Sequence, residues 1–104
     1  MNTKVENLRN KNQFVITTAK PFTLTFQSYE STIAHINEGG GLRLFKDFDY
    51  SRTTMKHLYI FLEESLPLLN QETREHIKQT LQSNNKRKAL QELINKKKIA
   101  YELN

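Results

Sequence analysis

Polar and apolar side chains alternate with a period of two through the first half of the chain. The clearest example is residues 22–28, where Phe22, Leu24 and Phe26 alternate with threonine and glutamine. Such alternation is typical of a strand that buries one face, because successive side chains of a strand point to opposite sides. Three further segments are rich in the β-branched and aromatic residues that strands favour. The strands predicted in this way are residues 13–19, 22–28, 31–36 and 42–46.

Proline and glycine mark the turns between these strands. Pro21 interrupts the pattern, because proline fixes φ and has no N–H for a strand ladder, and the first two strands are therefore predicted to form a hairpin. All three glycines of the chain stand together at residues 39–41. A phosphate-binding loop would continue through Gly-Lys-Ser/Thr into a helix, whereas this run continues into the strand pattern LRLF. The sequence therefore favours a hairpin turn at the glycines.

The period changes from two to 3.6 after residue 49, which predicts helices. In the first helix, Met55, Leu58, Leu62 and Leu66 fall on one face, and the helix is expected to end near residue 65 because a proline follows. A second helix is predicted after an N-cap at Asn70, and it would turn residues 73, 77 and 81 inward before ending near residues 83–85. The last helix is expected to span residues 86–102, and its apolar side would consist of Ala89, Leu90, Leu93, Ile94, Ala100 and Tyr101.

Strands followed by helices predict an α+β fold, with a small antiparallel sheet of about four strands packed under three helices. A chain of 104 residues is too short for separate hydrophobic cores, so we expect a single domain. Residues 1–11 are polar without a sustained period, which predicts a frayed arm or a short helical turn. The strands would occupy residues 12–46 and the helical part residues 52–102. Because so small a sheet leaves edge strands uncovered, a homodimer is one expected assembly.

Composition places the chain among folded proteins with a basic surface. Hydrophobic residues make up 37% and aromatic residues 10%, which is enough for a modest core and more than a disordered chain carries. The net charge of +5 and the pI of about 9.6 favour nucleic acid, acidic proteins or anionic membrane surfaces as partners. The chain contains no cysteine, which excludes disulfides, zinc fingers and a thiol nucleophile. Since no apolar run resembles a signal peptide or a membrane span, we expect a soluble cytoplasmic protein without a membrane partner.

The basic character is concentrated near the C-terminal end. From residue 86 onward six basic residues stand against two acidic ones, a net charge of +4, whereas the preceding residues carry ten basic and nine acidic side chains. Helical geometry spreads these charges around the ends of the predicted helix instead of along one stripe. They form either a solvated basic helix or a surface for phosphate or an acidic partner. Only Tyr101 lies among them, so a platform for stacked bases is not indicated.

The stretch YSRTTMKH places three serine or threonine hydroxyls, two basic side chains and a histidine at a predicted helix start. Ser51 or Thr53 is placed to cap the helix by accepting a hydrogen bond from the first turn. Arg52, Lys56 and His57 would then remain free to contact an anion or a partner. A catalytic interpretation would use a hydroxyl nucleophile with the histidine as base. The sequence around this stretch lacks the Gly-rich elbow, the oxyanion signature and the orienting carboxylate that such an enzyme would need.

The candidate binding residues are therefore basic residues and one histidine, and no catalytic residue is predicted. His35, His57 and His76 show no metal-binding spacing such as HExxH, so neither a metal nor a cofactor is expected. The set predicted to bind a partner or an anion is Arg52, Lys56, His57, Lys86, Arg87, Lys88, Lys96, Lys97 and Lys98.

Two stretches together, SYESTIA at residues 28–34 and YSRTTMKH at residues 50–57, resemble a group of small uncharacterised proteins from phages and plasmids of Gram-positive bacteria. In that group an SYxTxIA strand is followed, after a short hairpin, by YSxTTxKH at a helix start. Ser31 replaces the threonine of the first pattern and keeps its hydroxyl. The resemblance covers about residues 26–62 and implies an accessory protein of a mobile element. Such proteins are often regulators or inhibitors of host nucleic-acid enzymes.

Three functions follow as hypotheses. The first is a non-enzymatic protein that binds and modulates a host nucleic-acid enzyme or nucleoprotein of the nuclease type, as anti-CRISPR and anti-restriction proteins do. The second is a direct DNA- or RNA-binding regulator that uses the basic C-terminal helix. The third is a small enzyme that uses the cluster of Ser51, Thr53 and His57.

Overall fold

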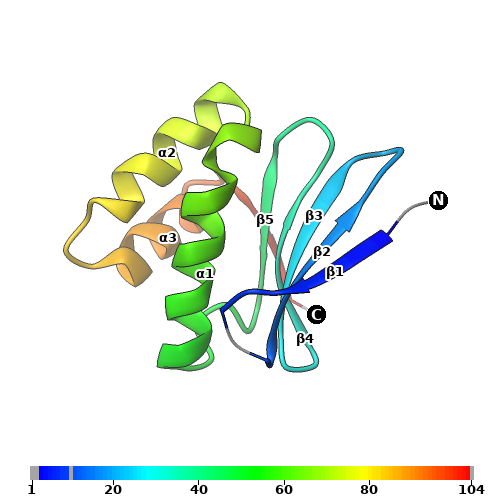
Figure 1. Ribbon diagram of the computed structural model, residues 1–104. Coiled ribbons are helices and arrows are strands. Elements are labelled where there is room, and N and C mark those ends of the chain that lie inside the picture. The colour runs from blue at the N-terminus through cyan, green and yellow to red at the C-terminus, as the bar shows by residue number, and fades with distance from the viewer. Residues whose placement is uncertain (1–2, 10, 104) are drawn as a thin grey trace.

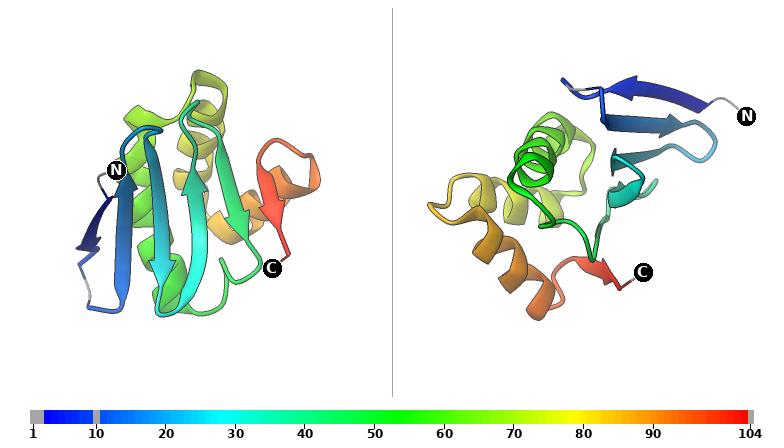
Figure 2. Two further views of the ribbon diagram at one scale, coloured as in Figure 1. Left: turned by 90° about the vertical axis from the view of Figure 1, so that its right-hand side faces the viewer. Right: turned by 90° about the horizontal axis from the view of Figure 1, so that it is seen from below.

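A sheet with a layer of helices against one of its faces makes up the described part of the chain, residues 3–9 and 11–103 of this computed structural model (Figure 1). No described helix covers the opposite face of the sheet (Figure 2). The strands are β1 (Thr3–Asn7), β2 (Gln13–Thr18), β3 (Thr23–Ser28), β4 (Ser31–Ile36), β5 (Leu42–Phe45) and β6 (Ala100–Glu102). The helices are α1 (Arg52–Ser65), the short 3-10 helix η1 (Leu66–Leu68), α2 (Gln71–Leu81) and α3 (Lys86–Asn95).

The six described strands lie in the sheet in their order along the chain. The first five form an antiparallel meander, and β6 then pairs with β5 in parallel. Parallel neighbours need a long crossover connection, and here α1, η1, α2 and α3 together supply it. The predicted α+β class and its three helices are confirmed, but the sheet is larger than predicted and mixed instead of antiparallel.

Strand β1 lies where the sequence predicted a frayed arm or a helical turn. It pairs with β2 in antiparallel register, with Val5 opposite Ile16. All five of its side chains are exposed, so it has no apolar alternation by which the sequence could have revealed it. Residues 1, 2 and 10 of the expected arm lie outside the described residues.

The last predicted helix ends early, and part of it is strand β6. Lys97 has φ of +58°, which is the left-handed conformation that follows many helix ends. Its N–H donates to the Ile94 carbonyl at 3.0 Å, and the N–H of Lys98 donates to the Leu93 carbonyl at 2.9 Å. These two bonds make a Schellman ending. Because glycine usually occupies the left-handed position and lysine stands there in this chain, the sequence did not signal the stop.

The core lies between the sheet and the helices. Phe26 of β3 stacks against Phe61 of α1, with ring centroids 5.6 Å apart, and both side chains are buried. Leu58 and Leu62 of α1 are buried as predicted, whereas Met55 is only half-buried. Phe22 was predicted to face the core and is 40% exposed instead, because β3 begins one residue later and Phe22 belongs to the turn before it. The buried apolar side chains further along the chain include Leu69, Ile77, Leu90 and Ile99.

The glycine run forms the turn between β4 and β5, as predicted. The Asn37 side chain organises this turn by accepting from the N–H groups of Gly39 and Gly41, each at 3.0 Å. Gly40 has φ of +83°, and a Cβ at this position would lie 2.4 Å from the backbone nitrogen of Asn70. The glycine is therefore needed both for its backbone conformation and for the close approach of α2.

The connection from α1 to α2 is held by the guanidinium of Arg74. Its Nε donates to the Leu66 carbonyl at 3.0 Å, and its Nη2 donates to the carbonyl oxygens of Leu69 at 2.8 Å and Pro67 at 3.3 Å. These carbonyl oxygens lie beyond the end of α1, where no following turn of that helix supplies N–H donors for them. Arg74 thus has a structural role, and it is not among the basic residues available to a partner.

Candidate binding sites

The start of α1 is joined to the sheet by a chain of hydroxyl groups. Ser51 is the N-cap, and its Oγ accepts from the Thr54 backbone N–H at 3.1 Å. The same Oγ donates to the Thr54 hydroxyl at 3.1 Å, and this hydroxyl lies 3.0 Å from that of Ser28 at the end of β3. Of the two capping residues proposed from the sequence, Ser51 has that role and Thr53 does not.

His57 lies inside the molecule, unlike the free surface histidine that the sequence suggested. Its side chain is buried, and its Nδ1 lies 2.8 Å from the Thr53 carbonyl oxygen, so Nδ1 carries the proton and donates. The described hydrogen bonds therefore connect the hydroxyls of this stretch to one another and the imidazole to backbone. Arg52 and Lys56 are exposed on the first turns of α1, where they remain accessible to a partner.

The SYES and YSRTT stretches, which are about 20 residues apart in the sequence, line one open cavity of about 870 Å³. We call this cavity the motif groove. It lies between the β3–β4 turn and the start of α1, with the β1–β2 loop as a third wall. Its lining residues are Asn12, Phe14, Ser28, Tyr29, Glu30, Ser31, Ile33, Asp47, Tyr50, Ser51, Thr53 and Thr54.

The basic residues at the start of α3 are partly engaged by other groups. Arg87 forms an ion pair with Asp49, with Nε and Oδ2 3.0 Å apart. The ammonium of Lys86 lies 6.0 Å from the ring centroid of Tyr59, at the limit of a cation–π contact. Burial raises the pKa of Tyr59, and the charge of Arg87 partly offsets that shift. Lys88 is exposed.

A second open cavity, of about 1050 Å³, lies along β4, β5 and the loop between α3 and β6. Four Lys, Arg or His side chains line it, namely His35, Arg43, Lys97 and Lys98, and we call it the cationic groove. His35 and Arg43 are direct cross-strand partners. Burial lowers the pKa of His35 from its ordinary value of 6.5, and the charge of Arg43 lowers it further.

One carboxylate offsets part of the positive charge of the cationic groove. Glu102 of β6 forms an ion pair with Arg43. Lys97 and Lys98 form no ion pair within residues 3–9 and 11–103, and both are exposed. The groove therefore keeps a net positive charge. The remaining lining residues are Asn37, Gly41, Leu42, Phe45, Thr73, Ile94, Ile99, Ala100 and Tyr101.

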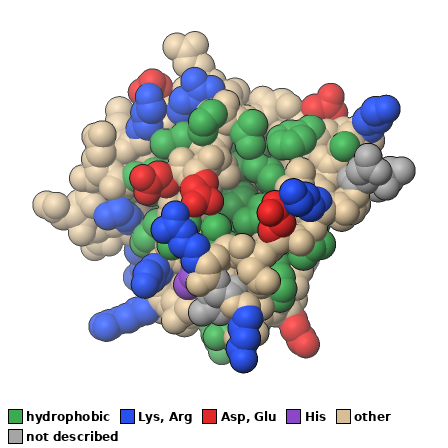
Figure 3. Space-filling view, viewed as in Figure 1, with side chains coloured by type: hydrophobic (Ala, Val, Ile, Leu, Met, Phe, Trp, Pro, Cys, Tyr) green, Lys and Arg blue, Asp and Glu red, His purple; other side chains and the backbone are tan. Residues whose placement is uncertain are grey.

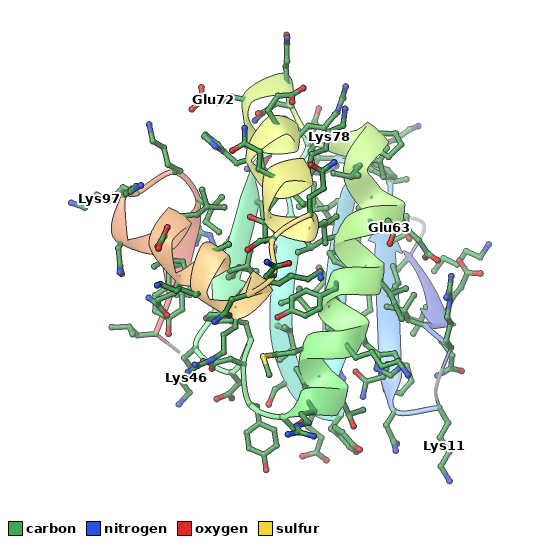
Figure 4. The ribbon with its side chains drawn as sticks, turned by 90° about the vertical axis from the view of Figure 1, so that its left-hand side faces the viewer. Lys11, Lys46, Glu63, Glu72, Lys78 and Lys97 are labelled. Carbon is green, nitrogen blue, oxygen red and sulfur yellow. The ribbon has the colours of Figure 1, made fainter. Side chains whose placement is uncertain are left out.

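The structure does not unite the predicted partner-binding residues in one surface. Residues 86–88 stand at one end of α3 and residues 96–98 at the other, about 15 Å apart along a ten-residue helix. Lys97 projects from the far end of α3, whereas Lys11 projects from the other side of the molecule (Figure 4). In the view of Figure 3, several Lys and Arg side chains gather over the region where α1 begins and α3 lies, with acidic and apolar side chains between them.

A family model described as a family of unknown function, DUF8033, matches residues 2–77. The chain belongs to this family. No curated protein matches the chain, and no solved structure matches it. The region matched to the DUF8033 model contains every residue that lines the motif groove. It ends before α3, so Lys97 and Lys98 of the cationic groove lie beyond it.

The sequence did not reveal Arg43, His35, Glu30 and Asp47 as site residues. Each is an ordinary strand or turn residue in the sequence, and only the folded sheet brings it beside residues far along the chain. Among the described residues, no group of three or more His, Cys, Asp or Glu side chains could hold a metal ion. No described helix is long and apolar enough to cross a membrane.

Proposed function

We propose that this protein is a non-enzymatic accessory protein of a phage or plasmid that binds and modulates a host nucleic-acid enzyme or nucleoprotein, in the manner of anti-CRISPR and anti-restriction proteins. The observation that carries the proposal is the cationic groove, in which Arg43 of β5 lines one cavity together with the adjacent Lys97 and Lys98, more than 50 residues later in the chain. The mobile-element origin rests on the SYESTIA and YSRTTMKH stretches.

A positively charged groove suits a partner with an acidic surface. Charge complementarity accelerates encounter and disfavours wrong partners. The two lysines have long side chains with freely rotating ammonium groups, which adapt to carboxylates on a protein or to phosphates in a nucleoprotein. The net charge of +5 adds to this attraction over the whole molecule.

The geometry at the start of α1 supports binding over catalysis. A serine or threonine nucleophile requires a base within hydrogen-bond reach. Here the Ser51 hydroxyl donates to Thr54, and among the described residues no hydrogen bond joins a hydroxyl of this stretch to the imidazole of His57. These groups stabilise the beginning of the helix and join it to the sheet.

Direct binding of DNA or RNA is the second candidate function. It is favoured by Phe45, which lines the cationic groove together with Arg43 and the two lysines. An aromatic ring among cations can stack on a base while the cations contact phosphates. Such binding weakens steeply as the salt concentration rises, because counterions are released from the phosphates.

We also propose that the protein pairs with a second copy through β1. This strand is an edge of the described sheet, and an edge strand presents unpaired backbone groups. An antiparallel pairing centred on Val5 would place Lys4 of each copy opposite Glu6 of the other. It would also cover Val5, which is 58% exposed.

Affinity purification from host lysate, with and without nuclease treatment, tests the proposed function. The wild type is compared with the charge reversal Lys97→Glu/Lys98→Glu and with the matched control Lys11→Glu/Lys78→Glu, whose two exposed lysines lie away from the groove (Figure 4). Recovery of a nucleic-acid enzyme that survives nuclease and is lost only in the groove variant is the expected result. Recovery of nucleic acid alone supports the second candidate. Equal loss in the control variant contradicts a role for the groove.

A further inference from the structure

The motif groove has the opposite charge from the rest of the molecule. Among the described residues that line it, only Glu30 and Asp47 are charged, in a chain whose net charge is +5. Neither carboxylate forms an ion pair within residues 3–9 and 11–103, whereas Glu6, Glu64 and Glu102 each pair with a basic side chain. Two carboxylates that line one cavity and have no ion-pair partner among the described residues favour a cation that comes from outside.

Two exposed tyrosines line the same cavity. Tyr29 and Tyr50 are 51% and 76% exposed, whereas Phe26, Phe48 and Phe61 are buried in the core. The electron-rich face of an aromatic ring attracts a guanidinium or ammonium group. Carboxylates and aromatic rings in one cavity therefore both favour a cationic side chain.

The walls of the groove are held in place without a ligand. The Tyr29 N–H donates to the Asn12 carbonyl at 2.7 Å, which fixes the β3–β4 turn against the β1–β2 loop. The buried hydroxyls of Ser28 and Thr54 join the end of β3 to α1 at 3.0 Å. A preformed site of this kind loses little conformational entropy when it binds.

We propose that the motif groove binds an arginine side chain from a partner polypeptide. Arginine fits better than lysine, because its planar guanidinium can stack on a tyrosine ring and donate several hydrogen bonds to carboxylates at the same time. The site is independent of the cationic groove. It means that the protein offers an acidic and aromatic cavity as well as a basic one.

An anion is the alternative ligand for a cavity at the start of a helix. A helix N-terminus attracts anions through its free N–H groups. In this chain Ser51 already accepts from the Thr54 N–H, and Arg52, which carries the nearest positive charge in the sequence, is not among the lining residues. The two carboxylates that do line the groove would repel an anion.

Titration with blocked Gly-Gly-Arg-Gly-Gly peptide, followed by amide chemical shifts in NMR, tests the proposal. The arms are the arginine peptide, the lysine peptide, and a citrulline peptide that keeps the shape of arginine without its charge. We expect saturable shifts at residues 28–31 and 50–54 with arginine, weaker binding with lysine, and binding at least about ten-fold weaker with citrulline. Equal binding of the citrulline peptide, or preferential binding of sulfate at these residues, overturns the proposal.

Variants locate the binding. The double variant Glu30→Gln/Asp47→Asn is expected to weaken binding of the arginine peptide at least about ten-fold. Tyr50→Ala is expected to weaken it several-fold. The matched control Glu63→Gln/Glu75→Gln removes two exposed carboxylates outside the groove and is expected to change binding less than about two-fold. An equal loss in the control, or no loss in the groove variant, contradicts the site. Retained dispersion of the NMR spectrum shows that each variant is folded.

Discussion

The backbone N–H of Asn70 donates to the carbonyl oxygen of Gly40 at 3.0 Å, which ties the β4–β5 turn to the start of α2. The side chain of Asn70 caps α2 at the same point, with its Oδ1 accepting from the Thr73 N–H at 2.9 Å. Asn70 thus caps α2 with its side chain and anchors that helix to the sheet with its backbone. The position of α2 therefore depends on how closely the glycine turn can approach the backbone of residues 68–70.

Replacing Gly40 by alanine should destabilise the protein by about 2–5 kcal/mol, which adds the cost of a left-handed alanine to that of overpacking. A Cβ at residue 40 would lie 2.4 Å from the Asn70 nitrogen and 2.9 Å from the Leu68 carbonyl oxygen. Gly39→Ala is the matched control, because its Cβ would meet nothing closer than the Asn37 Oδ1 at 3.5 Å. Urea unfolding measures the free energy of unfolding of both variants. Equal losses of stability would contradict the close packing at Gly40.

The buried side chain of Gln13 should be replaceable by methionine without loss of stability. It is fully buried at the start of β2, opposite Ser28, and neither amide atom has a hydrogen-bond partner in the described part of the chain. An unsatisfied buried amide costs roughly 1–3 kcal/mol, so an apolar side chain of similar length is expected to be neutral or stabilising. Thermal unfolding tests this, with Gln13→Glu as the contrasting variant that should destabilise strongly. A large loss of stability in Gln13→Met would mean that the amide is satisfied.

His35 should make the free energy of unfolding depend on pH in a defined direction. Its pKa in the folded protein lies below the ordinary value of 6.5, because of burial and then the charge of Arg43. Between these two pKa values the unfolded chain binds more protons than the folded one, so stability falls as pH falls through 6.5 and levels off below the lowered pKa. His35→Gln should lose this contribution, whereas the control His76→Gln should keep it. Urea unfolding across this pH range gives the comparison.

The same histidine reports on the cationic groove. An anion bound beside Arg43, Lys97 and Lys98 would offset their charges, so added sulfate should raise the pKa of His35 measured by NMR. Lys97→Glu/Lys98→Glu should raise that pKa without sulfate, for the same electrostatic reason. A pKa that responds to neither change would contradict a shared electrostatic environment in this groove.

The proposed pairing of two β1 strands predicts a charge-swap result. Lys4→Glu alone should weaken dimerisation about ten-fold or more, because two opposite-charge pairs become like-charge pairs. Lys4→Glu/Glu6→Lys should restore it, because the swapped pairs are again complementary. Light scattering coupled to size exclusion over a concentration series gives the association constants. A monomeric wild type, or a double variant as weak as the single one, would contradict the pairing.

Much of the fold was predictable from the sequence because its signals are local. Alternation in residues 22–28 and the 3.6 period after residue 49 follow directly from which face of each element is buried, and the structure confirms β3 and α1. Strand β1 escaped prediction because it buries no face, and β6 because a lysine at residue 97 takes the conformation usually left to glycine. The pairing of β1 depends on tertiary contacts, and the left-handed lysine before β6 is a rare conformation. Neither strand therefore has a local sequence pattern that would predict it.

The sites were less predictable, because both grooves are made by residues far apart in the chain. The sequence singled out the SYES and YSRTT stretches as a pair of motifs, but their convergence on one cavity depends on how α1 packs over the end of β3. Likewise it identified Lys97 and Lys98 as basic, but not the strand residues Arg43 and His35 that accompany them. The contribution of His57 was misjudged, since its place on the inner side of α1 depends on packing that the helix start alone does not define.

The parallel pairing of β5 with β6 also has a consequence for the order in which the chain can fold. Each strand from β2 to β5 pairs with the strand made just before it, whereas Ala100 of β6 pairs with Arg43 across the entire helical segment. On a ribosome, β5 therefore keeps an open edge until residues 100–102 have been synthesised. For that interval the edge of β5 is a template for any other extended segment nearby, including β6 of a neighbouring copy.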